Sequence, residues 1–185
     1  MKSIFKNLPI LALVTILMAC GGSSQQENAQ SSTTVAPGLG QSAVKDDVSN
    51  PNIVQVAVGS PDHTTLVAAL KAAEYVDALT NVGPFTVFAP TDAAFAALPA
   101  GTVESLVKKE NQRKLRDILE YHVLLGVYKA ENFVNGQKIG TAEGGSVTME
   151  LQSDGTILVN GAKILGSVQT SNGMIHVVDR VLLPE

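Results

Sequence analysis

Residues 83–95, GPFTVFAPTDAAF, combine a short apolar run with the beginning of a helix. The β-branched and aromatic side chains of residues 86–88 predict a strand. Beyond Pro90, Thr91 and Asp92 offer a hydroxyl and a carboxylate that can cap a helix over the following residues. We therefore expect a core strand followed by a packed helix, and a capping role for Asp92 rather than a ligand role.

Apolar residues at helical spacing lie on both sides of this stretch. Upstream, the pattern from Leu66 to Leu79 follows the cap candidates Thr64 and Thr65 and predicts a helix. Downstream, Thr102 is a further cap candidate before a short apolar run. The helices are therefore expected to come early in the domain.

A longer helix is expected over residues 111–123. Its apolar face carries Leu115, Ile118 and Leu119, and His122 stands at the next position of the same face. This spacing predicts that His122 is buried.

The last part of the chain alternates like strands and is interrupted by Asn-Gly and Asp-Gly pairs, which tolerate the positive φ angles of tight hairpins. We predict strands over residues 146–152, 156–159, 161–164, 167–170, 174–178 and 181–183. Helices that come first and hairpins that follow indicate an α+β fold for residues 51–185, a length typical of one domain.

Composition excludes several classes of protein. The 185 residues contain a single cysteine, which rules out an internal disulfide and a zinc site made of cysteines. The 13 Lys and Arg against 17 Asp and Glu give a net charge of -4, which leaves no basic footprint for nucleic acid. No nucleic-acid partner is expected.

Residues 1–19 read as a signal peptide, because two lysines precede a 12-residue apolar run that is too short to span a bilayer. The run ends at Leu17-Met18-Ala19-Cys20-Gly21, which resembles the cleavage motif of bacterial lipoproteins. That resemblance implies a lipid on Cys20, and thus an anchor in the membrane. An ordinary secretory signal followed by a free thiol is the alternative. We expect a location in the cell envelope, at the outer membrane or the cell surface.

Residues 20–50 change to Gly, Ser, Gln, Asn and Thr, a composition that cannot bury enough surface to fold. They are interpreted as the lipidated cysteine and a disordered tether, with an r.m.s. reach of roughly 30 Å. The folded domain is then expected over residues 51–185.

Three motifs within that domain are similar to those of the fasciclin (FAS1) family. Residues 83–95 resemble its first signature, and residues 172–184, NGMIHVVDRVLLP, resemble its second. Between them, Tyr121-His122-Val123-Leu124 resembles the Tyr-His motif of the family. The resemblance implies a β-wedge or sandwich with helices packed against it, and a role in adhesion or in binding extracellular ligands.

The family also implies candidate binding residues. The Tyr-His region is implicated in integrin adhesion in animal relatives, so Tyr121 and His122 are the binding candidates. The residues also fit a buried pair that bonds nearby backbone, and this interpretation is favoured. Ser167-Val168 stands where those relatives have Asp-Ile, so we expect no integrin recognition of that kind.

Motifs of catalysis are missing from the sequence, which has no Gly-x-Ser-x-Gly, His-Glu-x-x-His, Walker or Gly-x-Gly-x-x-Gly pattern. We expect no enzymatic activity, metal site or cofactor. The leading hypothesis is an adhesion or binding module for an extracellular protein or polysaccharide. The alternative is a carrier of a small apolar ligand, since some fasciclin relatives bind carotenoids.

Overall fold

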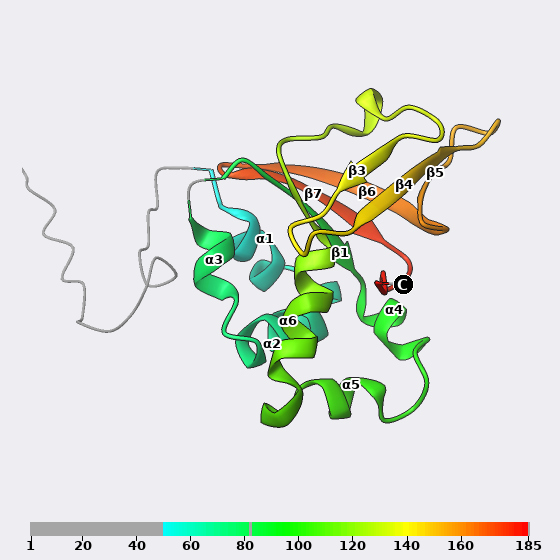
Figure 1. Cartoon of the computed structure of the whole chain (residues 1–185). Helices are drawn as coiled ribbons and strands as arrows, with labels where there is room; N and C mark the ends of the chain where they lie inside the picture. Colours follow the sequence, from blue (N-terminus) through cyan, green and yellow to red (C-terminus); the bar gives the residue numbers. More distant parts are fainter. Residues whose placement is uncertain (1–49, 82, 185) are drawn as a thin grey trace, which may run out of the picture. The chain divides into compact units, whose positions relative to one another are not determined.

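The computed structural model describes residues 50–81 and 83–184 (Figure 1). Its helices cluster before and after the first strand, as the sequence predicts. They are α1 (Ile53–Gly59), α2 (Thr64–Ala72), α3 (Val76–Thr80), α4 (Asp92–Ala96), α5 (Thr102–Leu106) and α6 (Gln112–Tyr121), with single 3-10 turns η2 (Pro61–His63), η3 (Lys109–Asn111) and η4 (Ala130–Asn132). None of the helices in the described residues has the length and apolar composition that a membrane crossing requires.

Seven strands form one sheet in the order β2-β1-β7-β6-β5-β4-β3. They are β1 (Phe85–Pro90), β2 (Val123–Leu125), β3 (Lys138–Gly140), β4 (Ser146–Leu151), β5 (Ile157–Val159), β6 (Ala162–Thr170) and β7 (Gly173–Val178). A bridge between Leu124 and Thr141 brings β2 beside the end of β3, so the sheet is nearly closed. The helices lie on one side of it, and the predicted α+β class is confirmed (Figure 1).

The two signature stretches lie side by side, because β1 and β7 form a parallel pair from Phe85 opposite Gly173 to Pro90 opposite Val178. A Cβ atom at Gly173 would overlap the carbonyl oxygen of Phe85. Glycine is therefore required there by the close approach of the two backbones. The signatures encode the centre of the sheet.

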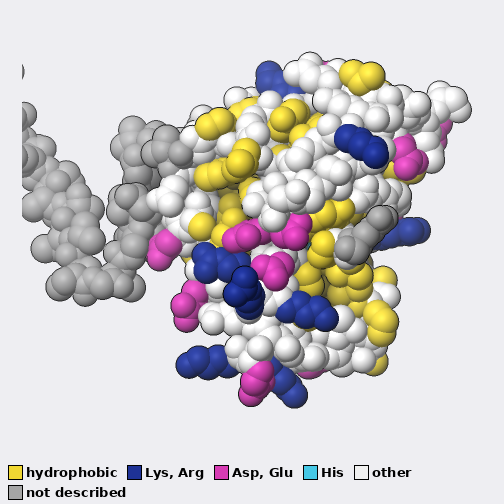
Figure 2. All heavy atoms as spheres, in the orientation of Figure 1, with side chains coloured by type: hydrophobic (Ala, Val, Ile, Leu, Met, Phe, Trp, Pro, Cys, Tyr) yellow, Lys and Arg dark blue, Asp and Glu magenta, His cyan; other side chains and the backbone are white. Residues whose placement is uncertain are grey.

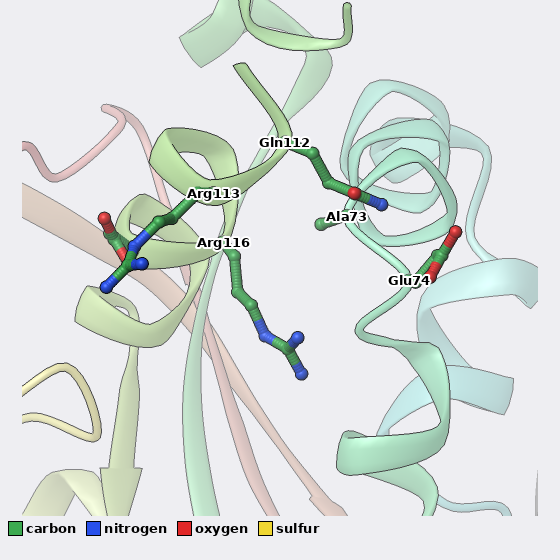
Figure 3. Close-up of a pocket in the computed structure, with 6 residues that line it drawn as sticks. Ala73, Glu74, Gln112, Arg113 and Arg116 are labelled. Atoms are coloured by element: carbon green, nitrogen blue, oxygen red, sulfur yellow. The ribbon is translucent and has the colours of Figure 1, made fainter. Parts of the chain in front are cut away.

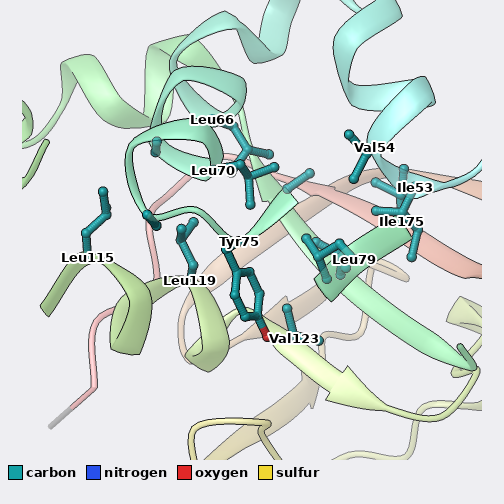
Figure 4. Close-up of a cluster of buried hydrophobic side chains, with 14 residues drawn as sticks. Ile53, Val54, Leu66, Leu70, Tyr75, Leu79, Leu115, Leu119, Val123 and Ile175 are labelled. Carbon is teal, nitrogen blue, oxygen red and sulfur yellow. The ribbon is translucent and has the colours of Figure 1, made fainter. Parts of the chain in front are cut away.

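Two hydrophobic cores lie on opposite sides of these strands. Val87, Ala89 and Ile175 pack with the helices in the first core (Figure 4). Phe88 and Val178, which alternate with them, pack in the second core against residues of β3, β4 and β5. Because successive side chains of a strand point to opposite faces, β1 and β7 are buried on both sides. This explains their continuous apolar sequences.

Several predicted strands differ from the structure. The strands predicted over residues 161–164 and 167–170 fall in one strand, β6, which begins at Ala162 and has an irregularity in pairing between Ile164 and Gly166. Leu165 lies at this bulge and is 54% exposed. Residues 181–183 form no strand, and the three-residue strands β2 and β3 were not predicted. Three residues carry too little periodicity to be recognised alone; β5 is equally short but was predicted because turn pairs, Asp154-Gly155 and Asn160-Gly161, lie on both sides of it.

Helix boundaries also differ. The helix expected to run from Leu66 to Leu79 is divided into α2 and α3 at Glu74, which has a positive φ of 52°. Helix α1 was missed, although Asn52 and Gln55 form a capping box at its start. At α5 the N-cap is Gly101 and not Thr102, so that capping prediction is wrong.

The capping prediction for Asp92 holds, but for a different helix. Thr91 caps α4 by accepting a bond from the Ala94 N–H at 3.2 Å. The carboxylate of Asp92 instead accepts bonds from the Thr64 hydroxyl at 2.6 Å and the Thr65 N–H at 2.8 Å. Thr64 and Thr65 were predicted as caps of α2. They instead donate hydrogen bonds to Asp92, which accepts them at the start of that helix.

Candidate functional site

His122 follows the last residue of α6 and is buried, as predicted. Its Nε2 accepts a bond from the Leu182 N–H at 2.9 Å, so the ring proton lies on Nδ1 and is donated to the Ile118 carbonyl at 2.8 Å. Burial lowers the pKa of His122 to about 4. The neutral ring therefore joins α6 to the segment that follows β7.

Tyr121 is buried beside it and points into the second core. Its hydroxyl donates to the Ser146 carbonyl at 3.0 Å and accepts from the Asn160 amide at 2.9 Å. The ring lies under Gly145, where a Cβ atom would come within 3.0 Å of it. Tyr121 thus supports two turns that are distant in sequence, one before β4 and one after β5.

A polar hollow opens above this tyrosine, with a volume of about 630 Å³. Lys138 and Glu143 are exposed at its edge, and Ser146 and Thr148 add hydroxyl groups. Such a set can donate and accept hydrogen bonds to a polar ligand. We call this feature the Tyr121 hollow, and it is lined by Tyr121, Lys138, Glu143, Gly144, Gly145, Ser146, Thr148, Asn160 and Pro184.

The hollow could not be found from the sequence, because its lining comes from four separate parts of the chain: residues 121, 138–148, 160 and 184. Tyr121 was identified by its motif, but only the folded sheet brings it beside Thr148 and Asn160. The Asn160-Gly161 pair gave a signal for the turn, and both residues have positive φ, of 45° and 77°. Nothing in the sequence indicated the hydrogen bond from the Asn160 side chain to the Tyr121 hydroxyl.

His176 is a further buried histidine, in β7. Its Nε2 donates to the Tyr128 carbonyl at 2.8 Å, and the Ser167 hydroxyl donates to its Nδ1 at 2.7 Å. Burial lowers its pKa. Ser167 is thus bonded within the domain.

Of the site residues predicted from the sequence, Tyr121 and His122 lie in the described part of the chain. Tyr121 and His122 are buried and bonded to backbone, which was the favoured interpretation. Their role in binding stays a prediction, and a partner would meet the surface that they support. Cys20 lies outside the described residues. Within residues 50–81 and 83–184, no group of three or more His, Cys, Asp or Glu could hold a metal ion.

An apolar groove of about 730 Å³ lies between α1, α2 and α3. Val54, Val58, Val67 and Val76 line it, and Val58 is 58% exposed. Gln55, Lys71, Glu74 and Asp77 contribute polar groups to the lining. This groove was not predicted from the sequence, because α1, which forms one wall, was not predicted.

A comparison with protein families identifies the fold. The model of the fasciclin domain matches residues 61–184, which is more than half of the chain. The chain belongs to the fasciclin domain family. Helix α1 lies before the matched residues, and its Ile53 and Val54 pack in the first core.

Relatives and a solved structure agree with this assignment. Protein sll1483 of Synechocystis is 44% identical over 175 residues, which are 94% of this chain and 89% of the relative. Cell surface glycolipoprotein MPB83 of Mycobacterium bovis is 34% identical over 137 residues, which are 71% of this chain and 60% of the relative. The FAS1 domain pair of the insect cell adhesion molecule fasciclin I has a TM-score of 0.64 at 20% identity, over 72% of this chain and 51% of that chain. This structural match confirms the fasciclin fold.

Proposed function

We propose that this chain is a non-catalytic fasciclin module that binds cell-surface, matrix or envelope components from a lipid anchor at Cys20. The observation that carries the proposal is the fasciclin match over residues 61–184. Relatives support its two parts, since MPB83 is named a cell surface glycolipoprotein and the structural match comes from a cell adhesion molecule.

The anchor is tested by metabolic labelling with an alkyne-tagged fatty acid. We expect the label on the wild-type chain and none on a Cys20→Ala chain, which should leave the membrane fraction. Labelling that persists without Cys20 would show that the lipid is attached to another residue.

The binding surface is proposed at the Tyr121 hollow, where exposed polar groups surround a site fixed by buried hydrogen bonds. The test is retention of cells or envelope fragments on a surface coated with the protein. Lys138→Glu changes the edge of the hollow, and Lys163→Glu makes the same charge change at an exposed site in β6. Loss of retention with Lys138→Glu alone supports the hollow, whereas equal retention with both variants contradicts it.

A carrier of a small apolar ligand, such as a carotenoid, is the second candidate function. The apolar groove between α1, α2 and α3 favours it, because exposed Val58 and the partly exposed Val67 and Val76 could cover an apolar chain. A visible absorbance band that copurifies with the protein is the expected result. Val58→Asp should abolish the band and Val134→Asp should keep it, since the two valines are similarly exposed, at 58% and 63%. A colourless wild-type protein that takes up no added carotenoid would rule the carrier out.

A further inference from the structure

Charged side chains are unevenly placed in this domain. The described residues hold ten Lys or Arg, and five of them fall within residues 108–116. That segment contains one acid, Glu110, whereas the remaining described residues hold twelve acids and five bases. One short segment is therefore strongly basic in a domain that is acidic as a whole.

The segment covers η3 and the first turns of α6, next to α5. Arg116 is engaged within the domain, 3.3 Å from the Glu120 carboxylate and 5.2 Å from the centre of the Tyr75 ring. The other four bases are exposed, and we call them the basic end: Lys108, Lys109, Arg113 and Lys114. In Figure 1 the α5 side of the domain lies at the opposite end from β3, β4 and β5, and Figure 2 shows most Lys and Arg of that face over the helices.

A small anion is a poor fit to this region. The hollow beside the basic end, between α6 and the residues that follow α2, has a volume of about 370 Å³ (Figure 3). Arg113 and Arg116 line it, but so do the carboxylates of Glu74 and Asp117. Two acids beside two arginines offset the attraction for a single phosphate. The lysines lie outside this hollow, and Val107, 39% exposed, precedes them. An extended, flat anionic surface fits such an end better.

We propose that the basic end docks on the anionic headgroups of a phospholipid bilayer and so orients the domain on its membrane. Lys and Arg near an anionic bilayer are attracted within a Debye length, about 10 Å at 0.1 M salt. Acids on the strands and turns far from the basic end, such as Glu131, Glu150 and Asp154, are repelled by the same surface, which favours one orientation. Glu74 and Asp117, which lie beside Arg113, offset part of the attraction. The Tyr121 hollow then faces away from the lipid, toward a partner. This inference rests on the envelope location in the proposed function.

The test is cosedimentation of the unlipidated Cys20→Ser full chain with vesicles. One set contains about 30 mol% phosphatidylglycerol in phosphatidylcholine, and the other contains phosphatidylcholine alone. The basic-end variant carries K108E, K109E, R113E and K114E. The control variant reverses four other exposed bases, with K129E, K138E, K163E and R180E, so both variants have the same net charge.

We expect the wild type to prefer the anionic vesicles and to lose this preference at high salt. The basic-end variant should lose the preference by about tenfold or more, and the control variant much less. Equal losses in both variants, or no preference in the wild type, overturn the proposal. Binding of soluble alginate but not of anionic vesicles through the basic end also overturns it, in favour of an anionic polymer.

Two further measurements separate loss of docking from loss of folding and from loss of adhesion. Circular dichroism shows whether the reversed chains fold, and K108Q, K109Q, R113Q and K114Q together provide a milder variant whose loss should be intermediate. The basic-end variant should also retain cells or envelope fragments on a coated surface as the wild type does. A failed retention assay would count against the adhesion role, whereas a failed vesicle assay counts against the docking alone.

Discussion

His122 contributes to the domain through its position and its lack of charge. Both ring nitrogens are bonded inside the protein, one to the Ile118 carbonyl and the other to the Leu182 N–H. A second proton on the ring would leave the Leu182 N–H facing a donor in a buried site. The neutral form is therefore a condition of the folded state.

We predict that the domain loses stability between about pH 6.5 and pH 4. The unfolded chain binds a proton at His122 near pH 6.5, whereas the folded chain does so only near pH 4, so the free energy of unfolding falls as pH falls. Below about pH 4, the loss of stability due to His122 amounts to about 3 kcal/mol in the free energy of unfolding. Urea unfolding at several pH values measures it.

His122→Gln separates this histidine from the other titrating groups. The variant should be less stable than the wild type at pH 7 but should depend less on pH over the same interval. An unchanged slope would assign the pH dependence to other residues, such as buried His176, whose pKa is lowered in the same direction.

Gly173 fixes the approach of the two signature strands. We predict that Gly173→Ala destabilises the domain by about 3 kcal/mol or more, because its Cβ atom would overlap the Phe85 backbone. Gly166→Ala in β6 is the control, since nothing lies within 4 Å of a Cβ there. Thermal unfolding compares the two, and similar melting temperatures would contradict the requirement for glycine.

Between elements, Asp92 in α4 accepts hydrogen bonds from donors at the start of α2, and Thr64 is 28 positions away in the sequence. The hydrogen bond from the Thr64 hydroxyl lowers the pKa of Asp92 to about 2. The folded state thus favours the carboxylate, and this contribution to stability is lost as pH falls from about 4 to 2. Asp92 therefore stabilises the start of α2, whereas local capping rules assign it to α4.

Asp92→Ala should lower the free energy of unfolding by about 1 kcal/mol at neutral pH, the usual value of a cap. Asp62→Ala, in the preceding 3-10 turn, removes an exposed acid and should change it by less than about 0.5 kcal/mol. Chemical denaturation measures both. Equal effects would mean that the bonds to Thr64 and Thr65 add nothing.

Elements with strong local patterns were predictable, and those made by distant contacts were not. The apolar run of β1 and the spacing on α6 identified both elements within a few residues. Strands β2 and β3 have three residues each, and their pairing depends on partners elsewhere in the chain. The burial of His122 followed from helical spacing, whereas the Tyr121 hollow required the folded sheet.

For the whole domain, α1 decides where the folded unit begins. Ile53 and Val54 are buried in the first core, although they precede the residues matched by the fasciclin family, and Ala57 of the same helix is also buried. Asn172, in the second signature, accepts a bond from the Ile53 N–H at 3.0 Å and donates to the Leu79 carbonyl at 2.7 Å. The start of α1 is thus held by the turn before β7.

We predict that a chain beginning at residue 51 folds as stably as the full chain, and that one beginning at residue 61 does not. Removal of Ile53 and Val54 from the core should cost roughly 4 kcal/mol. Denaturant unfolding of the two shortened chains measures the difference. Equal stability would place the boundary at the start of the family match and would contradict a structural role for α1.

The bridge between Leu124 and Thr141 has a consequence for how the protein meets other molecules. It turns the outer edges of β2 and β3 toward each other, so the described sheet offers little unpaired backbone to an added strand. Copies of the domain can therefore be crowded together without joining edge to edge into fibres. Any partner has to be recognised through side chains and turns.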